Sequence, residues 1–171
     1  MLGEIYLWLR YLGPVCLFFA IALDFLNYGD IKRWLRSYSF LLLFGFYNFT
    51  VVALYFPFWA VLPVNFLILS CFLIFNWNKP GLNFSIMGAL SNIFVMLANG
   101  GKMPMPLGWA EEDFQYQFIN SKTHFIFLSD WIRAGDFIVS PGDFALYLGA
   151  ILFFLWQIYL FLKNRRKAVK N

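Results

Sequence analysis

Five long apolar runs, separated by turn or charge signals, constrain the fold of this sequence more than any other feature. They cover approximately residues 5–28, 38–56, 59–77, 82–98 and 141–162. Each is close to the ~20 residues that a helix needs to cross ~30 Å of hydrocarbon. The runs lack the alternation of barrel strands, and lipid cannot hydrogen-bond to an exposed backbone, so helices are required there. The sequence therefore predicts an all-α, polytopic transmembrane bundle of about five spans, forming one domain over residues 1–171.

Composition favours the same environment. Apolar residues make up 61% of the chain and charged residues only 13%, whereas an average soluble chain has about 25% charged residues. The formal net charge of +4 does not indicate nucleic acid, because nine of the thirteen Lys and Arg residues lie in three short segments flanking apolar runs. We expect membrane lipid as a partner, with a membrane-protein partner as an alternative, and no nucleic acid.

The basic residues also orient the predicted helices. The nine residues in question are Lys32, Arg33, Arg36, Lys79, Lys163, Arg165, Arg166, Lys167 and Lys170. With five spans, all three segments lie on one side, and an excess of Lys and Arg marks the cytoplasmic side. We therefore expect a multi-pass protein of the cell membrane with its N-terminus outside and its C-terminus in the cytoplasm. Seven of the nine acidic residues then lie outside, Glu111, Glu112 and Asp113 among them.

Residues 99–140 form a long outer segment between the fourth and fifth runs. Within it, residues 107–138 make up the one long stretch without a spanning run, and such a loop usually is functional or packs as a cap. We expect this stretch to lie on the outer face, partly helical and partly dipping into the membrane interface.

The fourth run carries the candidate ligand-binding residues. It ends in Asn99-Gly100-Gly101-Lys102, a good helix stop because Gly at a C-cap accepts the left-handed conformation. Lys102 then lies near groups that a positive charge binds, namely lipid phosphates or acidic side chains. Small and amide residues recur along the run at helical spacings: Ser85, Gly88, Ala89, Asn92 and Asn99. This stripe favours close helix packing over a pore lining, so we expect the run to be the central helix. The candidate ligand-binding residues are Asn92, Asn99, Gly100, Gly101 and Lys102.

The start of the fifth run has two interpretations. The sequence there is Ser140-Pro141-Gly142-Asp143, with a Ser at the N-cap, a Pro at the first helical position and an acid at the third. This is a capping box in which the shorter Asp takes the place of Glu. Alternatively, Asp143 faces the bundle with Tyr147 and Ala150 below it, making a polar notch.

Three residues are candidates for catalysis: His124, Asp130 and Asp143. Carboxylates at the hydrocarbon edge have raised proton affinity through desolvation, which is the usual route to a general acid at neutral pH. Whether the chain is an enzyme stays open.

Cys16, Cys71 and the single His124 are far apart in sequence, and a zinc site needs three or four ligands, so no metal site and no cofactor is predicted.

The chain resembles a group of small bacterial integral membrane proteins known only as a domain of unknown function. The resemblance rests on the Asn99–Pro104 loop (Asn-Gly-Gly-Lys-Met-Pro, with Arg common in place of Lys102), His124, the Phe127–Asp130 segment, and Ser140–Asp143 with Gly149. It implies a bacterial membrane protein, and it transfers no activity.

Three functions follow as hypotheses. The first is binding of a lipid, small ligand or partner protein through a polar pocket on the outer face. The alternative is a membrane-embedded hydrolase or transferase that acts on a lipid-anchored substrate, with Asp130 and Asp143 as acid and base and His124 assisting. A small transporter would need a charged or broken-helix site near the midplane. Apart from Asn92 none is evident, since Arg10 and Asp24 lie near helix ends where they can snorkel.

Overall fold

The computed structural model describes residues 2–53, 58–109 and 115–168. This part of the chain is mostly helical, with five α-helices: α1 (Leu2–Tyr28), α2 (Ile31–Ala53), α3 (Phe58–Asn76), α4 (Leu82–Ala98) and α5 (Pro141–Ala168). Each predicted apolar run corresponds to one helix, and α4 has the predicted bounds.

The helices α2 and α5 extend furthest beyond their apolar runs, because the charged residues that flank these runs also form helix. The α2 helix begins at Ile31 because the Oδ1 atom of Asp30 accepts hydrogen bonds from the backbone N–H groups of Lys32 (2.9 Å) and Arg33 (3.2 Å), a side-chain N-cap. Gly29, with φ +62°, separates it from α1. At the other end of the chain, α5 continues past the apolar run to Ala168.

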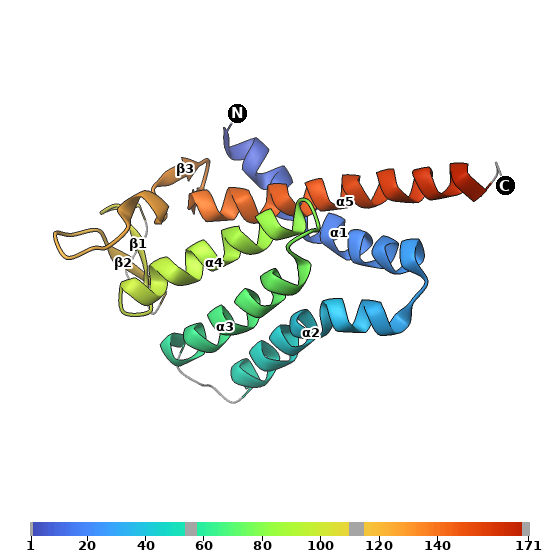
Figure 1. Ribbon diagram of the computed structural model, residues 1–171. Coiled ribbons are helices and arrows are strands. Elements are labelled where there is room, and N and C mark those ends of the chain that lie inside the picture. The colour runs from blue at the N-terminus through green and yellow to red at the C-terminus, as the bar shows by residue number, and fades with distance from the viewer. Residues whose placement is uncertain (1, 54–57, 110–114, 169–171) are drawn as a thin grey trace.

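The helices pack in the order α1, α5, α4, α3, α2, so that α4 lies in the middle, as predicted. In Figure 1, α1, α3 and α5 begin at the end of the bundle near the strands, whereas α2 and α4 end there. Successive helices therefore run in opposite directions.

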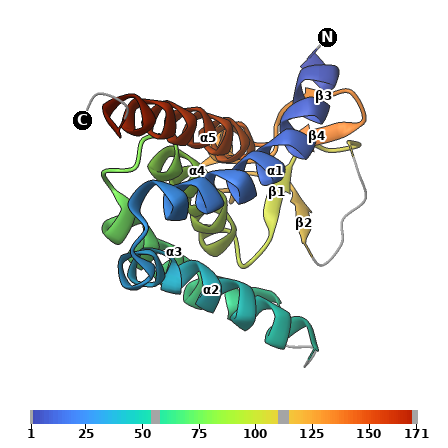
Figure 2. The ribbon, with the colours of Figure 1, turned by 90° about the vertical axis from the view of Figure 1, so that its right-hand side faces the viewer.

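Four short strands and one 3-10 helix cover that end, which we name the capped end (Figures 1 and 2). They are β1 (Met103–Met105), β2 (Tyr116–Phe118), η1 (Ile126–Leu128), β3 (Ile132–Ala134) and β4 (Phe137–Val139). β1 pairs with β2 in parallel, and β3 and β4 form an antiparallel hairpin. Gly135, with φ +67°, occupies the first central position of the two-residue hairpin turn, which favours Gly.

The described chain is mostly helical, as predicted, but the four strands show that it is not all-α. The outer segment was expected to be partly helical, and its described part contains the 3-10 helix η1 together with the strands. Three-residue strands are too short to show an alternating pattern, and all three residues of β1 are buried, so periodicity could not reveal them. Glu111, Glu112, Asp113 and Lys170 lie outside the described residues.

Two of the described helices are long and apolar enough to cross a membrane, over Gly3–Asn27 and Pro141–Arg166. The apolar stretches Val61–Asn76 and Leu82–Ala98 are shorter.

The predicted small-residue stripe lies against α5. A Cβ atom added to Gly88 would be 2.5 Å from the carbonyl oxygen of Gly142 and 2.6 Å from the amide nitrogen of Leu146, so only Gly allows this approach. One turn earlier, the Ser85 hydroxyl donates a hydrogen bond of 2.7 Å to the Leu146 carbonyl. The predicted close packing is confirmed for Ser85 and Gly88, and this contact places the start of α5 beside Asn92.

Candidate functional site

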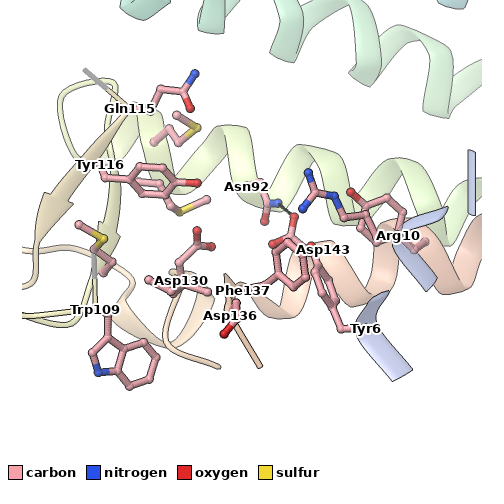
Figure 3. Close-up of a pocket in the computed structure, with 15 residues that line it drawn as sticks. Tyr6, Arg10, Asn92, Trp109, Gln115, Tyr116, Asp130, Asp136, Phe137 and Asp143 are labelled. Carbon is pink, nitrogen blue, oxygen red and sulfur yellow. Dashed lines mark hydrogen bonds between the residues drawn. The ribbon is translucent and has the colours of Figure 1, made fainter. Parts of the chain in front are cut away.

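A cavity of about 490 Å³ opens at the capped end, and we call it the main cavity. Its polar lining comes from separate parts of the chain, as Figure 3 shows: Arg10 from α1, Asn92 from α4, Asp143 from α5, and Asp130 and Asp136 from the outer segment. Two of the three predicted catalytic residues, Asp130 and Asp143, therefore share one cavity with the predicted ligand-binding residue Asn92.

Asp143 fulfils both interpretations of its position. As a cap, its Oδ2 atom accepts a hydrogen bond from the Ser140 amide (2.9 Å), while the Asp143 amide donates to the Ser140 hydroxyl (3.1 Å). This reciprocal pair is a capping box with Asp in place of Glu. Its Oδ1 atom accepts from the Asn92 side-chain amide (2.8 Å), and Tyr147 lines the same cavity. The hydroxyl of Ser140 also lies 2.8 Å from Asn92 Oδ1, so the three side chains hold one another in place.

Asp130 is buried and incompletely hydrogen-bonded. Its residue is only 4% exposed, and its Oδ1 atom has no hydrogen-bond partner among the described residues. The Asp130 amide donates to the carbonyl of Pro104 in β1 (3.1 Å), which fixes the backbone, and the side chain points into the main cavity (Figure 3). Burial, together with the negative charge of Asp143, raises the pKa of Asp130 to about 8. The carboxyl group therefore carries a proton at neutral pH and can donate a hydrogen bond.

Arg10 and an aromatic wall were not predicted. The guanidinium of Arg10 lies 4.9 Å from the centre of the Phe137 ring, a cation–π distance. Tyr6 packs against Phe137, Phe144 and Tyr147 with ring centres 5.5 to 6.0 Å apart. Arg10 does not snorkel away from the protein as expected, since it lines the cavity. A lone arginine inside an apolar run was the available signal, but only the tertiary fold pairs it with the β3–β4 hairpin.

His124 and Asn99 lie in a different place, around a cavity of about 320 Å³ that Gly100 and Lys122 also line. The Asn99 side chain accepts from the His124 amide (2.9 Å) and donates to the His124 carbonyl (3.0 Å). Asn99 therefore ties the outer segment to the end of α4, and the exposed His124 is not brought to Asp130 and Asp143. The proposed trio of catalytic residues is not assembled.

The two glycines that follow α4 end the helix as predicted. Gly100 and Gly101 have φ values of +69° and +92°, and the Gly101 amide donates to the Met96 carbonyl (2.7 Å). This bond is that of a Schellman motif, with Gly100 at the left-handed position. Lys102 follows the turn and lines neither the main cavity nor the cavity beside His124.

A second polar cluster lies at the opposite end of the bundle, and we call it the Asp24 cluster. Asp24, only 3% exposed, pairs with Lys79 (2.8 Å). Tyr38 of α2 (3.1 Å) and Gln157 of α5 (2.8 Å) also donate hydrogen bonds to its carboxylate. Burial lowers the pKa of Lys79, although the hydrogen bond to Asp24 opposes this shift. Asp24 was expected to snorkel, and it instead joins α1, α2, α5 and the α3–α4 connection.

The chemistry available in the main cavity is that of an ordered carboxylate, a protonated carboxyl, a guanidinium and aromatic rings. In the described chain, no group of three or more His, Cys, Asp or Glu side chains is placed to hold a metal ion. The site is therefore suited to polar recognition or to proton transfer.

Comparison with known proteins identifies relatives without assigning an activity. The sequence model described as "Family of unknown function (DUF5317)" matches residues 30–155. An uncharacterized protein of Thermotoga maritima is 32% identical over 148 residues, which is 80% of this chain and 86% of the relative. No solved structure matches.

Proposed function

The chain belongs to the DUF5317 family of unknown function, and we propose that it is a five-span membrane protein that binds a small amphiphilic ligand in the main cavity. One observation carries the binding role. Asp130 is buried, incompletely hydrogen-bonded and aimed into a cavity that is large enough for a small molecule. A ligand group that accepts or donates a hydrogen bond would satisfy it.

Several features support the membrane assignment. The alternating helix directions are those that five successive crossings require. Large apolar side chains face outward along the helices, with Phe18 70% and Ile74 73% exposed, which suits lipid better than water. The basic segments lie at the end opposite the strands. With the positive-inside rule, this end is cytoplasmic and the main cavity faces outside.

Cysteine labelling tests this topology. In a variant without Cys16 and Cys71, we expect Lys122→Cys to react with a membrane-impermeant maleimide on intact cells. We expect Asn164→Cys to react only after the cells are opened. Both positions are exposed in the structure, so reaction of Asn164→Cys on intact cells would reject the orientation.

Native mass spectrometry tests the binding role. The protein is extracted from membranes in a mild detergent, and bound molecules are identified by their mass. We expect a co-purified ligand that is depleted by Asp130→Asn or by Arg10→Gln. Lys122→Gln, at the other cavity, should retain it. Absence of any ligand from both the purified protein and a lipid-extract titration would reject the proposal.

The hydrolase or transferase alternative is favoured by one specific observation, namely that the buried Asp130 carboxyl shares a cavity with the Asp143 carboxylate, and burial raises the pKa of Asp130 to about 8. Two carboxyl groups in unlike environments can serve as general acid and general base. His124 would take no part. Incubation with a fluorescent phospholipid ester and a fluorescent lipid-anchored peptide should release product only with the wild type and not with Asp130→Asn. Failure to process either substrate would count against this alternative.

The small-transporter alternative gains no comparable support. It requires a charged or broken-helix site near the midplane, whereas the Asp24 cluster lies toward the end opposite the cap.

A further inference from the structure

We propose that the main cavity takes a zwitterionic group in which a primary amine and a phosphate are joined by a short linker, as in the ethanolamine headgroup of a phospholipid. This inference rests on the proposed binding function and names the class of ligand. It follows from the arrangement of charge, hydrogen-bonding groups and aromatic rings around the cavity.

The charges around the cavity are mixed, and this favours a ligand that carries both a positive and a negative charge. Arg10 contributes one positive charge, while Asp136 and Asp143 contribute carboxylates. A purely anionic ligand would meet the two carboxylates, and a purely cationic ligand would meet Arg10. A ligand with both charges can place each one beside its opposite.

The phosphate end is assigned to Arg10. Among the described residues, Arg10 stacks on Phe137 and makes no ion pair, and a guanidinium is well suited to bidentate recognition of phosphate. Asp130 lines the same cavity, and its protonated carboxyl can donate a hydrogen bond to another oxygen of the ligand.

The amine end is assigned to Asp143 and its neighbours. Asn92 and Ser140 hold the Asp143 carboxylate in a fixed orientation, and a carboxylate has lone pairs for further donors. Tyr6, Tyr147 and Tyr116 add aromatic rings around the cavity, which attract a cation through their faces. A primary ammonium donates three hydrogen bonds, whereas a trimethylammonium donates none. The site should therefore prefer ethanolamine over choline.

Binding measurements with defined probes test the inference. Purified protein in detergent is titrated with phosphoethanolamine, phosphocholine, ethanolamine and inorganic phosphate, and its melting temperature and the heat of binding are recorded. We expect phosphoethanolamine to bind at least roughly tenfold more tightly than the other three, since each loses one charge-assisted contact. Arg10→Gln should reduce binding of phosphoethanolamine to the level of ethanolamine. Lys122→Gln should leave it unchanged.

A second arm identifies the source of the group. The protein is placed in lipid nanodiscs of phosphatidylcholine that contain either phosphatidylethanolamine or phosphatidylglycerol. Stabilisation by phosphatidylethanolamine alone, lost in Arg10→Gln, supports a lipid headgroup. Stabilisation by soluble phosphoethanolamine alone supports a free metabolite with the same chemistry. Because Asp143→Asn also removes a helix cap, the exposed Asp136→Asn serves as the second carboxylate variant and should weaken binding of the amine-bearing probes.

Two outcomes would overturn the inference. Equal binding of all four probes, or binding of none of them in either arm, contradicts recognition of the joined amine and phosphate. If native mass spectrometry finds a co-purified ligand of another class in the main cavity, the inference fails while the proposed binding function stands. If it finds no ligand at all, the binding function fails as well.

Discussion

At the scale of single residues, Asp130 and Asp143 occupy unlike environments within one cavity. Asp143 is held by hydrogen bonds from Asn92 and Ser140, whereas Asp130 is buried with an unpartnered oxygen. The burial of Asp130, together with the nearby charge of Asp143, raises the pKa of the Asp130 carboxyl to about 8.

The proton on Asp130 makes stability depend on pH. In the folded protein Asp130 releases its proton near pH 8, but in the unfolded chain it does so near pH ~3.9. Between these values the folded state holds one more proton, so the free energy of unfolding falls as pH rises, by at most about 1.4 kcal/mol per unit. We expect a lower melting temperature at pH 8 than at pH 6 in the wild type and a smaller decrease in Asp130→Asn. The exposed Asp136→Asn should behave as the wild type, and equal slopes in the wild type and Asp130→Asn would contradict the assignment.

Asn92 should matter for stability through its two hydrogen bonds. Asn92→Ala removes the donor to Asp143 and the acceptor near Ser140, which leaves partly buried polar groups unsatisfied. We expect the free energy of unfolding to decrease by about 1–3 kcal/mol, measured by denaturant titration in detergent micelles. The neighbouring Ser91→Ala is the control, because the buried Ser91 hydroxyl has no partner among the described residues. A similar loss in both variants would show that these hydrogen bonds contribute little.

The sequence revealed some of these residues but not all. Asp130, Asp143 and Asn92 stood out as polar groups beside or within apolar segments, and the structure brings them together. Arg10 had the same signal, but its partner Phe137 is 127 positions away in a short strand, and no local pattern predicts such a pairing.

At the scale of secondary-structure elements, the close contact of α4 with α5 positions the main cavity. The two glycines Gly88 and Gly142 lie where the helices meet. Gly88 is one turn before Asn92, and Gly142 directly precedes Asp143. A larger separation of the helices would move Asn92 away from Asp143.

Gly88→Ala tests this contact. The new methyl group would lie 2.5 Å from the Gly142 carbonyl oxygen, so the helices must separate, and overpacking of this kind costs about 1–3 kcal/mol. We expect a lower melting temperature together with weaker ligand retention. Met87→Leu, on the exposed face of the same helix, should change neither quantity. A fully stable Gly88→Ala protein would show that the interface can adjust.

The elements were predictable to different degrees. The helices were predictable because each corresponds to a long apolar run, and a run of about 20 apolar residues is typical of a helix with a continuous apolar surface. The strands could not be predicted, because each has three residues and β1 pairs with β2 across the segment that contains residues 110–114. Their formation depends on the helix ends that they cover.

At the scale of the whole molecule, the Asp24 cluster joins elements that are far apart in sequence. The buried ion pair of Asp24 with Lys79 is shared with Tyr38 and Gln157. Removing one partner leaves the other charge without compensation, which typically costs about 3–5 kcal/mol.

A double-mutant cycle with Asp24→Asn and Lys79→Met measures this coupling. We expect each single variant to be strongly destabilised and the double variant to be less destabilised than the sum of the two, because no unpaired charge remains. The measurement is the free energy of unfolding in detergent micelles. Strict additivity would mean that the two charges are solvated independently.

The helices α1 and α5, packed side by side, each contribute to both polar sites. Arg10 and Asp24 are fourteen residues apart on α1, and Asp143 and Gln157 are fourteen residues apart on α5. Fourteen residues make almost four full turns and about 21 Å, so each helix presents both groups on nearly the same side. The spacing between the two polar groups is therefore the same on α1 as on α5. A displacement of α1 along α5 would therefore move Arg10 at the main cavity and Asp24 at the opposite polar cluster together.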